Sequence, residues 1–133
     1  MNAENRGRNT ADELIRAEQA LQAAELLSDN GFHTDAVAKL YYHLLYLVRG
    51  LLLTKGLEPK SHEGALRLLA QHFEKDGPLV HGSVNTVAKI MKFREEADYN
   101  AAVHFTREDY LSLRQEAAGL ASAIRRIIDQ SAG

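Results

Sequence analysis

The sequence has no cysteine and no tryptophan, and only two of its 133 residues are proline. The lack of cysteine excludes disulfide bonds and thiolate chemistry and is typical of a cytoplasmic protein. The two prolines, Pro59 and Pro78, both fall in segments that already look like breaks between helices. Because helix-breaking residues are rare elsewhere, long uninterrupted helices are expected.

The chain also lacks a strong net charge and a long apolar run. Its net charge of −2 gives no general attraction for nucleic acid or anionic lipid. The longest apolar region, residues 40–53, is interrupted by His43, Arg49 and Gly50 and is too short to span a bilayer. Residues 1–9 are polar, without the apolar run of a signal peptide, and are expected to be flexible. We therefore expect a cytoplasmic protein without a membrane partner.

Hydrophobic residues, by contrast, are plentiful: they make up 45% of the chain, enough to bury one sizeable core. The length suits a single domain, expected over residues 10–130. Apolar residues recur at three- and four-residue steps, which predicts an all-α fold, an up-and-down antiparallel bundle of about five helices. The predicted helices cover about residues 11–27, 35–55, 62–75 and 84–100, with a fifth beginning at Thr106.

Short polar side chains mark the expected helix starts, where they can accept hydrogen bonds from free amides. Thr10 and Glu13 have the spacing of a capping box, and Thr106 and Asp109 repeat it with a shorter acid. Single N-caps are predicted for the other three helices at Thr34, Ser61 and Ser83.

The fourth predicted helix changes character halfway along. On a helical wheel, Arg94 and Asp98 continue the inward apolar stripe of Val87, Ile90 and Met91. Charges on an inward face cost desolvation energy unless they are paired and hydrogen-bonded. The pair is therefore either a structural bracket between helices or the floor of a polar pocket, and both interpretations stay open.

Six histidines raise the question of a metal site. A di-iron four-helix bundle needs Glu-x-x-His pairs, and the sequence contains none. The His-Glu-x-x-His motif of zinc peptidases is absent as well. We expect no tightly bound metal and no cofactor.

A small cationic segment, Lys60-Ser61-His62, opens the third predicted helix. Free amides at a helix start, with a lysine and a histidine, could receive a phosphate, although ordinary N-capping also explains Ser61. On the second helix, Tyr41 and Tyr42 are expected in the core. One of their hydroxyls should reach the polar patch of the fourth helix, because a buried tyrosine hydroxyl needs a partner.

Four features occur in an order that is typical of one known family. Tyr41-Tyr42 opens a long apolar helix, the segment KSHEG follows at 60–64, a glycine-containing turn comes next, and REEADY stands at 94–99 before a last amphipathic helix. Together they resemble the HEPN domain family, and in particular its small stand-alone prokaryotic branch with the RxxADY motif. The resemblance covers about residues 11–129.

The resemblance implies a helical bundle, a homodimer, and a minimal nucleotidyltransferase as partner in a toxin–antitoxin-like pair. Many HEPN proteins are metal-independent ribonucleases, in which an arginine is followed after four to six residues by a histidine and two copies meet at a dimer interface. In those enzymes the arginine stabilises the phosphate, and the histidine transfers a proton at the ribose 2′-oxygen or the leaving oxygen. The matching arginine here is Arg94.

The sequence departs from that ribonuclease pattern. Tyr99 stands where a histidine is expected, in the spacing Arg-x4-Tyr, and His104 comes too late. A tyrosine ordinarily titrates near pH 10, which makes it a poor proton shuttle at neutral pH. His62 is the best replacement histidine, provided that it folds toward Arg94.

Three hypotheses for function follow. The first is a nucleotide- or phosphate-binding partner of a minimal nucleotidyltransferase. Its predicted ligand-binding residues are Tyr42, Lys60, His62, Arg94 and Asp98. The second is a metal-independent ribonuclease toxin, with Arg94 on the RNA phosphate and His62 or Tyr99 in proton transfer. The third is a purely structural interaction bundle in which Arg94 and Asp98 pin helices together.

Overall fold

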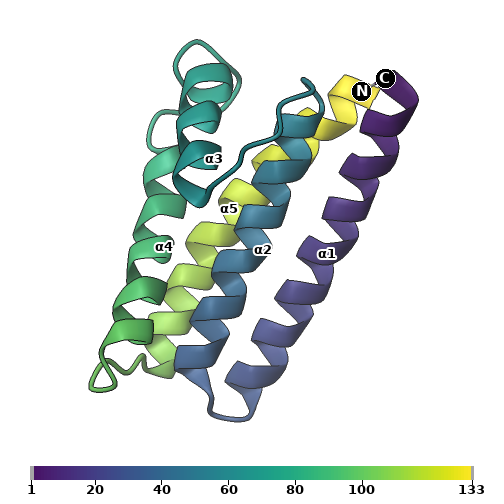
Figure 1. Ribbon diagram of the computed structural model, residues 1–133. Coiled ribbons are helices and arrows are strands. Elements are labelled where there is room, and N and C mark those ends of the chain that lie inside the picture. The colour runs from purple at the N-terminus through teal and green to yellow at the C-terminus, as the bar shows by residue number, and fades with distance from the viewer. Residues whose placement is uncertain (1, 133) are drawn as a thin grey trace.

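Five α-helices and one short π-helical turn make up the computed structural model, which describes residues 2–132. The elements are α1 (Ala3–Asp29), α2 (His33–Leu53), α3 (His62–Leu69), the π-helical turn η1 (Ala70–Glu74), α4 (Ser83–Tyr99) and α5 (Arg107–Ala132). No strand occurs in residues 2–132, so the predicted all-α bundle is confirmed. Figure 1 shows the helices running up and down beside one another, with the first turn of α1 and the last turn of α5 at the same end.

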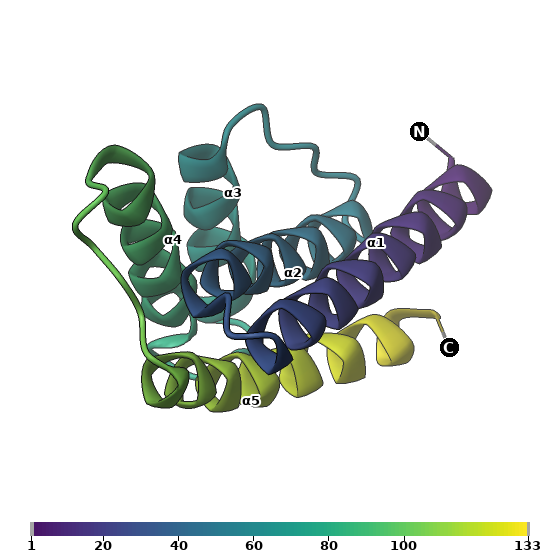
Figure 2. The same cartoon turned by 90° about the horizontal axis from the view of Figure 1, so that it is seen from below.

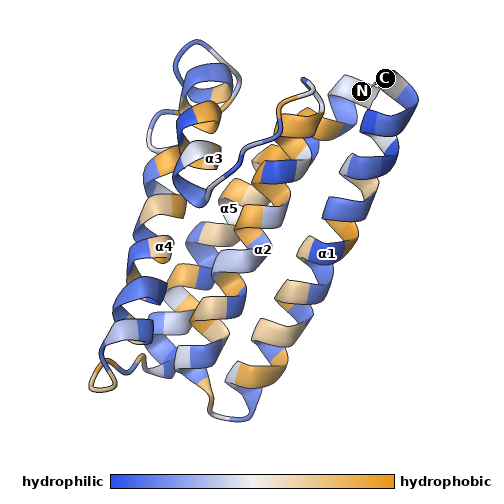
Figure 3. Ribbon diagram, viewed as in Figure 1, coloured by the Kyte–Doolittle hydropathy of each residue, from blue (hydrophilic) through white to orange (hydrophobic). Residues whose placement is uncertain are grey.

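Helix α2 lies at the centre of the bundle and packs against α1, α3, α4 and α5. Figure 2 shows it between α1 on one side and α3 and α4 on the other, with α5 along a further side. Leu40, Leu44, Leu47 and Leu51 are completely buried, and Figure 3 shows hydrophobic residues concentrated along this helix. Burial of each such side chain contributes about 1.5–3 kcal/mol, which makes α2 the main source of stability.

Helix α2 is also the one helix in the described residues that is long and apolar enough to cross a membrane by length and composition alone. In the bundle, however, 72% of its most apolar window is buried by the other helices. Its apolar character is therefore explained by its place in the core.

The start of α1 differs from the sequence-based prediction. The helix begins at Ala3 rather than near residue 11, and its N-cap is Asn2, whose side chain accepts a hydrogen bond from the Asn5 amide at 2.8 Å. Residues 3–9, expected to be flexible, form its first turns. The predicted cap at Thr10 is wrong, because this residue is buried inside the helix and its hydroxyl donates to the carbonyl oxygen of Gly50 at 3.2 Å.

Gly50 allows α1 to lie close to α2 at this point. A Cβ built there would stand 3.5 Å from the Cβ of Glu13 and 3.6 Å from the carbonyl oxygen of Thr10. The polar first half of α1 is thereby held against the C-terminal half of α2.

Two of the predicted caps are confirmed. The Ser61 hydroxyl accepts a hydrogen bond from the Gly64 amide at 2.9 Å and fixes the start of α3. At the start of α5, the Thr106 amide donates to the Asp109 carboxylate at 2.9 Å, and the Asp109 amide donates to the Thr106 hydroxyl at 3.1 Å. Aspartate is therefore long enough to complete this capping box.

Two other predicted caps are wrong, because both residues lie inside their helices and the N-cap positions are Phe32 and Gly82. Thr34 lies inside α2, and its hydroxyl accepts from the amide of Phe105 at 3.0 Å. Ser83 lies inside the first turn of α4, whose Val84 amide donates to the Glu74 carboxylate at 2.8 Å. The π-helical turn η1 thus supplies the cap of α4, the helix that carries Arg94.

Candidate functional site

Arg94 points inward from α4, as the helical wheel predicts. Its side chain is 17% exposed, whereas that of Asp98, at an N–O distance of 3.3 Å, is 54% exposed. Nη1 of Arg94 also donates a hydrogen bond to the Tyr42 hydroxyl at 2.9 Å. The expected contact between a tyrosine of α2 and the polar patch of α4 is therefore confirmed, and Tyr42 is the tyrosine that makes it.

The guanidinium of Arg94 also stacks against two aromatic rings. Its Cζ lies 5.2 Å from the ring centre of Tyr41 and 5.5 Å from that of Tyr42, within the range of cation–π attraction. The two rings meet edge to face, 5.3 Å apart. Burial raises the pKa of Tyr41 to about 12, even though Arg94 acts in the opposite direction. Tyr41 therefore stays neutral and can donate a hydrogen bond.

One buried polar atom of this cluster has no hydrogen-bond partner in residues 2–132. This atom is Nε of Arg94, which makes no hydrogen bond within the described part of the chain. A buried donor without an acceptor costs about 1–3 kcal/mol, so the side chain is not optimised as a purely structural bracket. The cluster has unused hydrogen-bonding capacity at its arginine.

His62 reaches the same pair of tyrosines from the start of α3. Its ring centre lies 5.6 Å from that of Tyr41 and 6.5 Å from that of Tyr42. Since Arg94 contacts both of these rings from α4, the structure brings the histidine and the arginine to one aromatic pair. Four predicted ligand-binding residues, Tyr42, His62, Arg94 and Asp98, thus belong to one cluster, and Tyr41 lies at its centre.

The fifth predicted ligand-binding residue, Lys60, is exposed and lies beside His62 in the wall of a small cavity of about 200 Å³. Arg49 of α2 and Ser61 also line this cavity, and none of its lining residues is acidic. In the described part of the chain, neither Arg49 nor Lys60 has a carboxylate within ion-pair distance. We call this the cationic cavity.

Arg49 was missed as a site residue by sequence reasoning. A signal for it existed, because it is the one ionic side chain in the apolar region 40–53. It also lies seven residues after Tyr42, on the same face of a helix. A half-buried arginine on that face needs an acceptor, and no acceptor in residues 2–132 contacts it.

Tyr99 is a predicted site residue that lies outside both the cluster and the cationic cavity. It is 91% exposed at the last position of α4. An α-helix turns by about 100° per residue, so five residues after Arg94 it points away from the tyrosine pair. His104 is exposed in the connection between α4 and α5. Neither side chain has a contact that would give it a role in the cluster.

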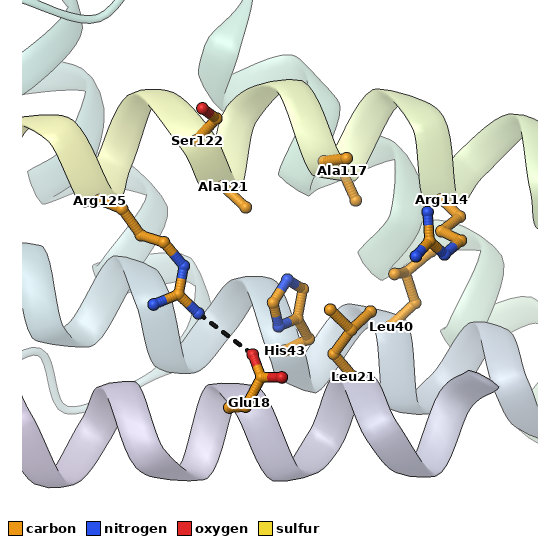
Figure 4. A pocket seen from close by; sticks show the side chains of 10 residues that line it. Glu18, Leu21, Leu40, His43, Arg114, Ala117, Ala121, Ser122 and Arg125 are labelled. Carbon is orange, nitrogen blue, oxygen red and sulfur yellow. Dashed lines mark ion pairs between the residues drawn. The ribbon is translucent and has the colours of Figure 1, made fainter. Parts of the chain in front are cut away.

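A second cavity, of about 270 Å³, lies on the other side of α2, between α1 and α5 (Figure 4). His43 is 2% exposed at its floor, and its Nδ1 lies 2.8 Å from the carbonyl oxygen of Ala17. Burial lowers the pKa of His43. Two arginines line the walls, and each is paired with a glutamate of α1: Arg125 with Glu18 at 3.6 Å, and Arg114 with Glu25.

Metal coordination finds no support in the part of the chain that the structure describes. No group of three or more histidine, aspartate or glutamate side chains is placed to hold an ion there. The candidate site is therefore an arrangement of cations, tyrosine hydroxyls and a histidine, and its chemistry suits an anion such as a phosphate.

Comparisons with known proteins show which family the chain is similar to. A family model described as the HEPN domain matches residues 11–127. Two similar proteins come from Methanocaldococcus jannaschii. "Putative toxin MJ0142" is 35% identical over 94 residues, or 71% of this chain and 64% of that protein, just under two thirds of its length. "Putative toxin MJ0605" is 32% identical over 114 residues, or 86% of this chain and 84% of that protein. A Thermotoga maritima protein named "UPF0332 protein" is 32% identical over 86% of both chains.

Proposed function

The chain belongs to the HEPN domain family, and on that premise we propose that it binds the phosphate of a nucleotide in the cationic cavity. The protein would act in this way as one half of a toxin–antitoxin-like pair with a minimal nucleotidyltransferase. In this proposal Arg49 and Lys60 supply the positive charge, and His62 supplies a further hydrogen-bond donor. Arg94 orients the two tyrosine rings that His62 contacts.

The observation that carries this proposal is the unbalanced charge of the cationic cavity. Arg49 is half-buried and lacks a carboxylate partner in residues 2–132, and Lys60 lies beside it in the same wall. Buried or half-buried cations are normally paired, because desolvation without a counterion is costly. An incoming phosphate would supply the missing negative charge, and arginine suits it because two of its N–H groups can bind two oxygens.

The biological setting rests on the family and its members. The resemblance implies the nucleotidyltransferase partner and a homodimer, and two of the similar proteins carry the name toxin. If the chain and a nucleotidyltransferase encoded beside it failed to co-purify, the proposed partnership would be refuted. Light scattering of the purified chain tests the homodimer separately.

Nucleotide binding is tested by calorimetry with adenosine monophosphate. We expect the Arg49→Ala/Lys60→Ala double variant to bind at least tenfold more weakly than the wild type, because it lacks both uncompensated cations. Lys92→Ala is the matched control, since Lys92 is an exposed cation on the outer face of α4. Equal affinity of the double variant and the wild type would refute the proposed phosphate site.

A second function, metal-independent RNA cleavage, is favoured by one specific observation. His62 and Arg94 meet on one tyrosine pair, although the sequence separates them by 32 positions. His62 would transfer the proton, and Arg94 would stabilise charge on the phosphate. The test is RNA incubation in EDTA with the wild type, His62→Ala, Arg94→Ala and Lys92→Ala. Cleavage that persists in both His62→Ala and Arg94→Ala, or that is absent in the wild type, rejects this function.

A further inference from the structure

The cationic cavity does not end at Lys60. A larger cavity of about 510 Å³ lies beside it, and Arg49, Pro59 and Lys60 line both. The two cavities therefore share a wall that carries two cations without carboxylate partners in the described residues. A phosphate held at this wall would leave the rest of its molecule room to enter the larger cavity.

The larger cavity differs from the cationic cavity in the charge of the side chains that line it. Three basic and three acidic side chains surround it: Arg16, Arg49, Lys60, Asp12, Glu13 and Glu58. Carboxylates repel a phosphate but accept hydrogen bonds from N–H groups. The space beyond the shared wall is therefore suited to the part of a ligand that carries donors.

Glu13 is the carboxylate with the clearest need for such a donor. Its side chain is 12% exposed, and its Oε1 receives a long contact of 3.4 Å from Nη1 of Arg16. Its Oε2 is buried and has no hydrogen-bond partner among the residues that the structure describes. Arg16 is itself held over the Tyr46 ring, with Cζ 4.3 Å from the ring centre. An N–H donor from a ligand would relieve the cost of this poorly solvated carboxylate.

We propose that the larger cavity receives the base of the bound nucleotide, and that Glu13 accepts a hydrogen bond from an exocyclic amino group of that base. The inference rests on the proposed function, because it places the phosphate between Arg49 and Lys60. It adds a preference: cytosine, adenine and guanine carry such an amino group, whereas uracil presents a carbonyl oxygen that the carboxylate repels.

Cytidine and uridine monophosphate are the matched probes, because they are nearly equal in size and differ at the position of the amino group. Calorimetry on the full chain should show that the cytidine nucleotide binds about tenfold tighter, the size expected of a hydrogen bond to a charged acceptor. Glu13→Ala should reduce the difference to less than twofold. Glu96→Ala, which removes an exposed carboxylate on the outer face of α4, should keep it.

The outcomes separate this inference from the proposed function. Equal binding of both nucleotides by the wild type overturns the base preference and leaves the phosphate site intact. Discrimination that survives Glu13→Ala in a variant with an unchanged melting temperature overturns the role of Glu13. If neither nucleotide binds, the proposed function and this inference both fail.

Discussion

Two groups of basic side chains flank α2, and they differ in what balances their charge. In the cavity between α1 and α5, Arg114 and Arg125 each pair with a glutamate of α1. On the opposite side, Arg49 and Lys60 have no carboxylate partner in residues 2–132. A charge that the fold itself neutralises serves the fold, whereas one left unbalanced is available to a ligand.

Two histidines, His43 of α2 and His62 of α3, show the same contrast. His43 is 2% exposed and bound to a backbone carbonyl, and burial lowers its pKa so that it stays neutral. His62 is half-buried at the first position of α3. Its ring contacts two tyrosines, and Lys60 lies beside it. The first histidine is a part of the core, and the second is placed where a ligand can reach it.

The largest expected difference between the two sides is in ligand affinity. Arg94→Ala removes the cation that holds Tyr41 and Tyr42, and we expect nucleotide affinity to fall by about 10- to 100-fold. Arg114→Ala, on the other side of α2, should leave affinity within twofold. If Arg94→Ala lowers the melting temperature but keeps full affinity, the structural bracket is the better account of this residue.

The next largest effect is on stability. Glu25 pairs with Arg114 and accepts a hydrogen bond from the buried Tyr110 hydroxyl at 3.4 Å. Glu25→Ala leaves that hydroxyl without its partner, so we expect the free energy of unfolding to fall by about 1–3 kcal/mol in urea titrations. Nucleotide affinity should not change, and a loss of affinity would contradict the division between the two sides.

A smaller effect is expected where a single hydrogen bond is removed from the cluster. Tyr42→Phe keeps the ring beneath Arg94 but deletes the hydroxyl that accepts from Nη1 at 2.9 Å. The arginine becomes less well oriented, and nucleotide affinity should fall by about fivefold, with roughly 1 kcal/mol of stability lost. An unchanged affinity in calorimetry would show that Arg94 is positioned by its other contacts.

The pH dependence of stability should reveal the core histidine. Since burial lowers the pKa of His43 below its ordinary value of 6.5, the unfolded chain binds a proton there more readily than the folded one. Stability is therefore complete above about pH 6.5 and falls as the pH drops below it, by at most about 1.4 kcal/mol per pH unit for one proton. In His43→Gln the loss of stability at acid pH should be smaller than in the wild type. Identical profiles of unfolding free energy against pH for the two proteins would disprove the role given to His43.

The sequence predicts the bundle well, because the period of its apolar residues is a local property. The inward direction of Arg94 follows from the helical wheel for the same reason, whereas Asp98, expected on the same inward face, is 54% exposed because it lies in the last turn of α4. The approach of His62 to the tyrosine pair could not be derived, because it depends on how α3 packs against α2. For Arg49 the sequence offers only its isolated charge in an apolar region, and its neighbourhood with Lys60 again depends on packing. The cap at Thr10 was wrong because a stronger cap exists at Asn2, and only the contact with Gly50 shows that Thr10 is buried.

The most direct test of the account measures stabilisation by inorganic phosphate. Phosphate that binds only the folded protein raises its melting temperature by mass action. At matched ionic strength, phosphate in place of chloride should raise the melting temperature of the wild type and of Arg125→Ala by more than that of Arg49→Ala, whose rise reports only the general stabilisation by phosphate. An equal rise in all three proteins, or none in the wild type, would contradict the claim that the unpaired cations beside α3 form an anion site.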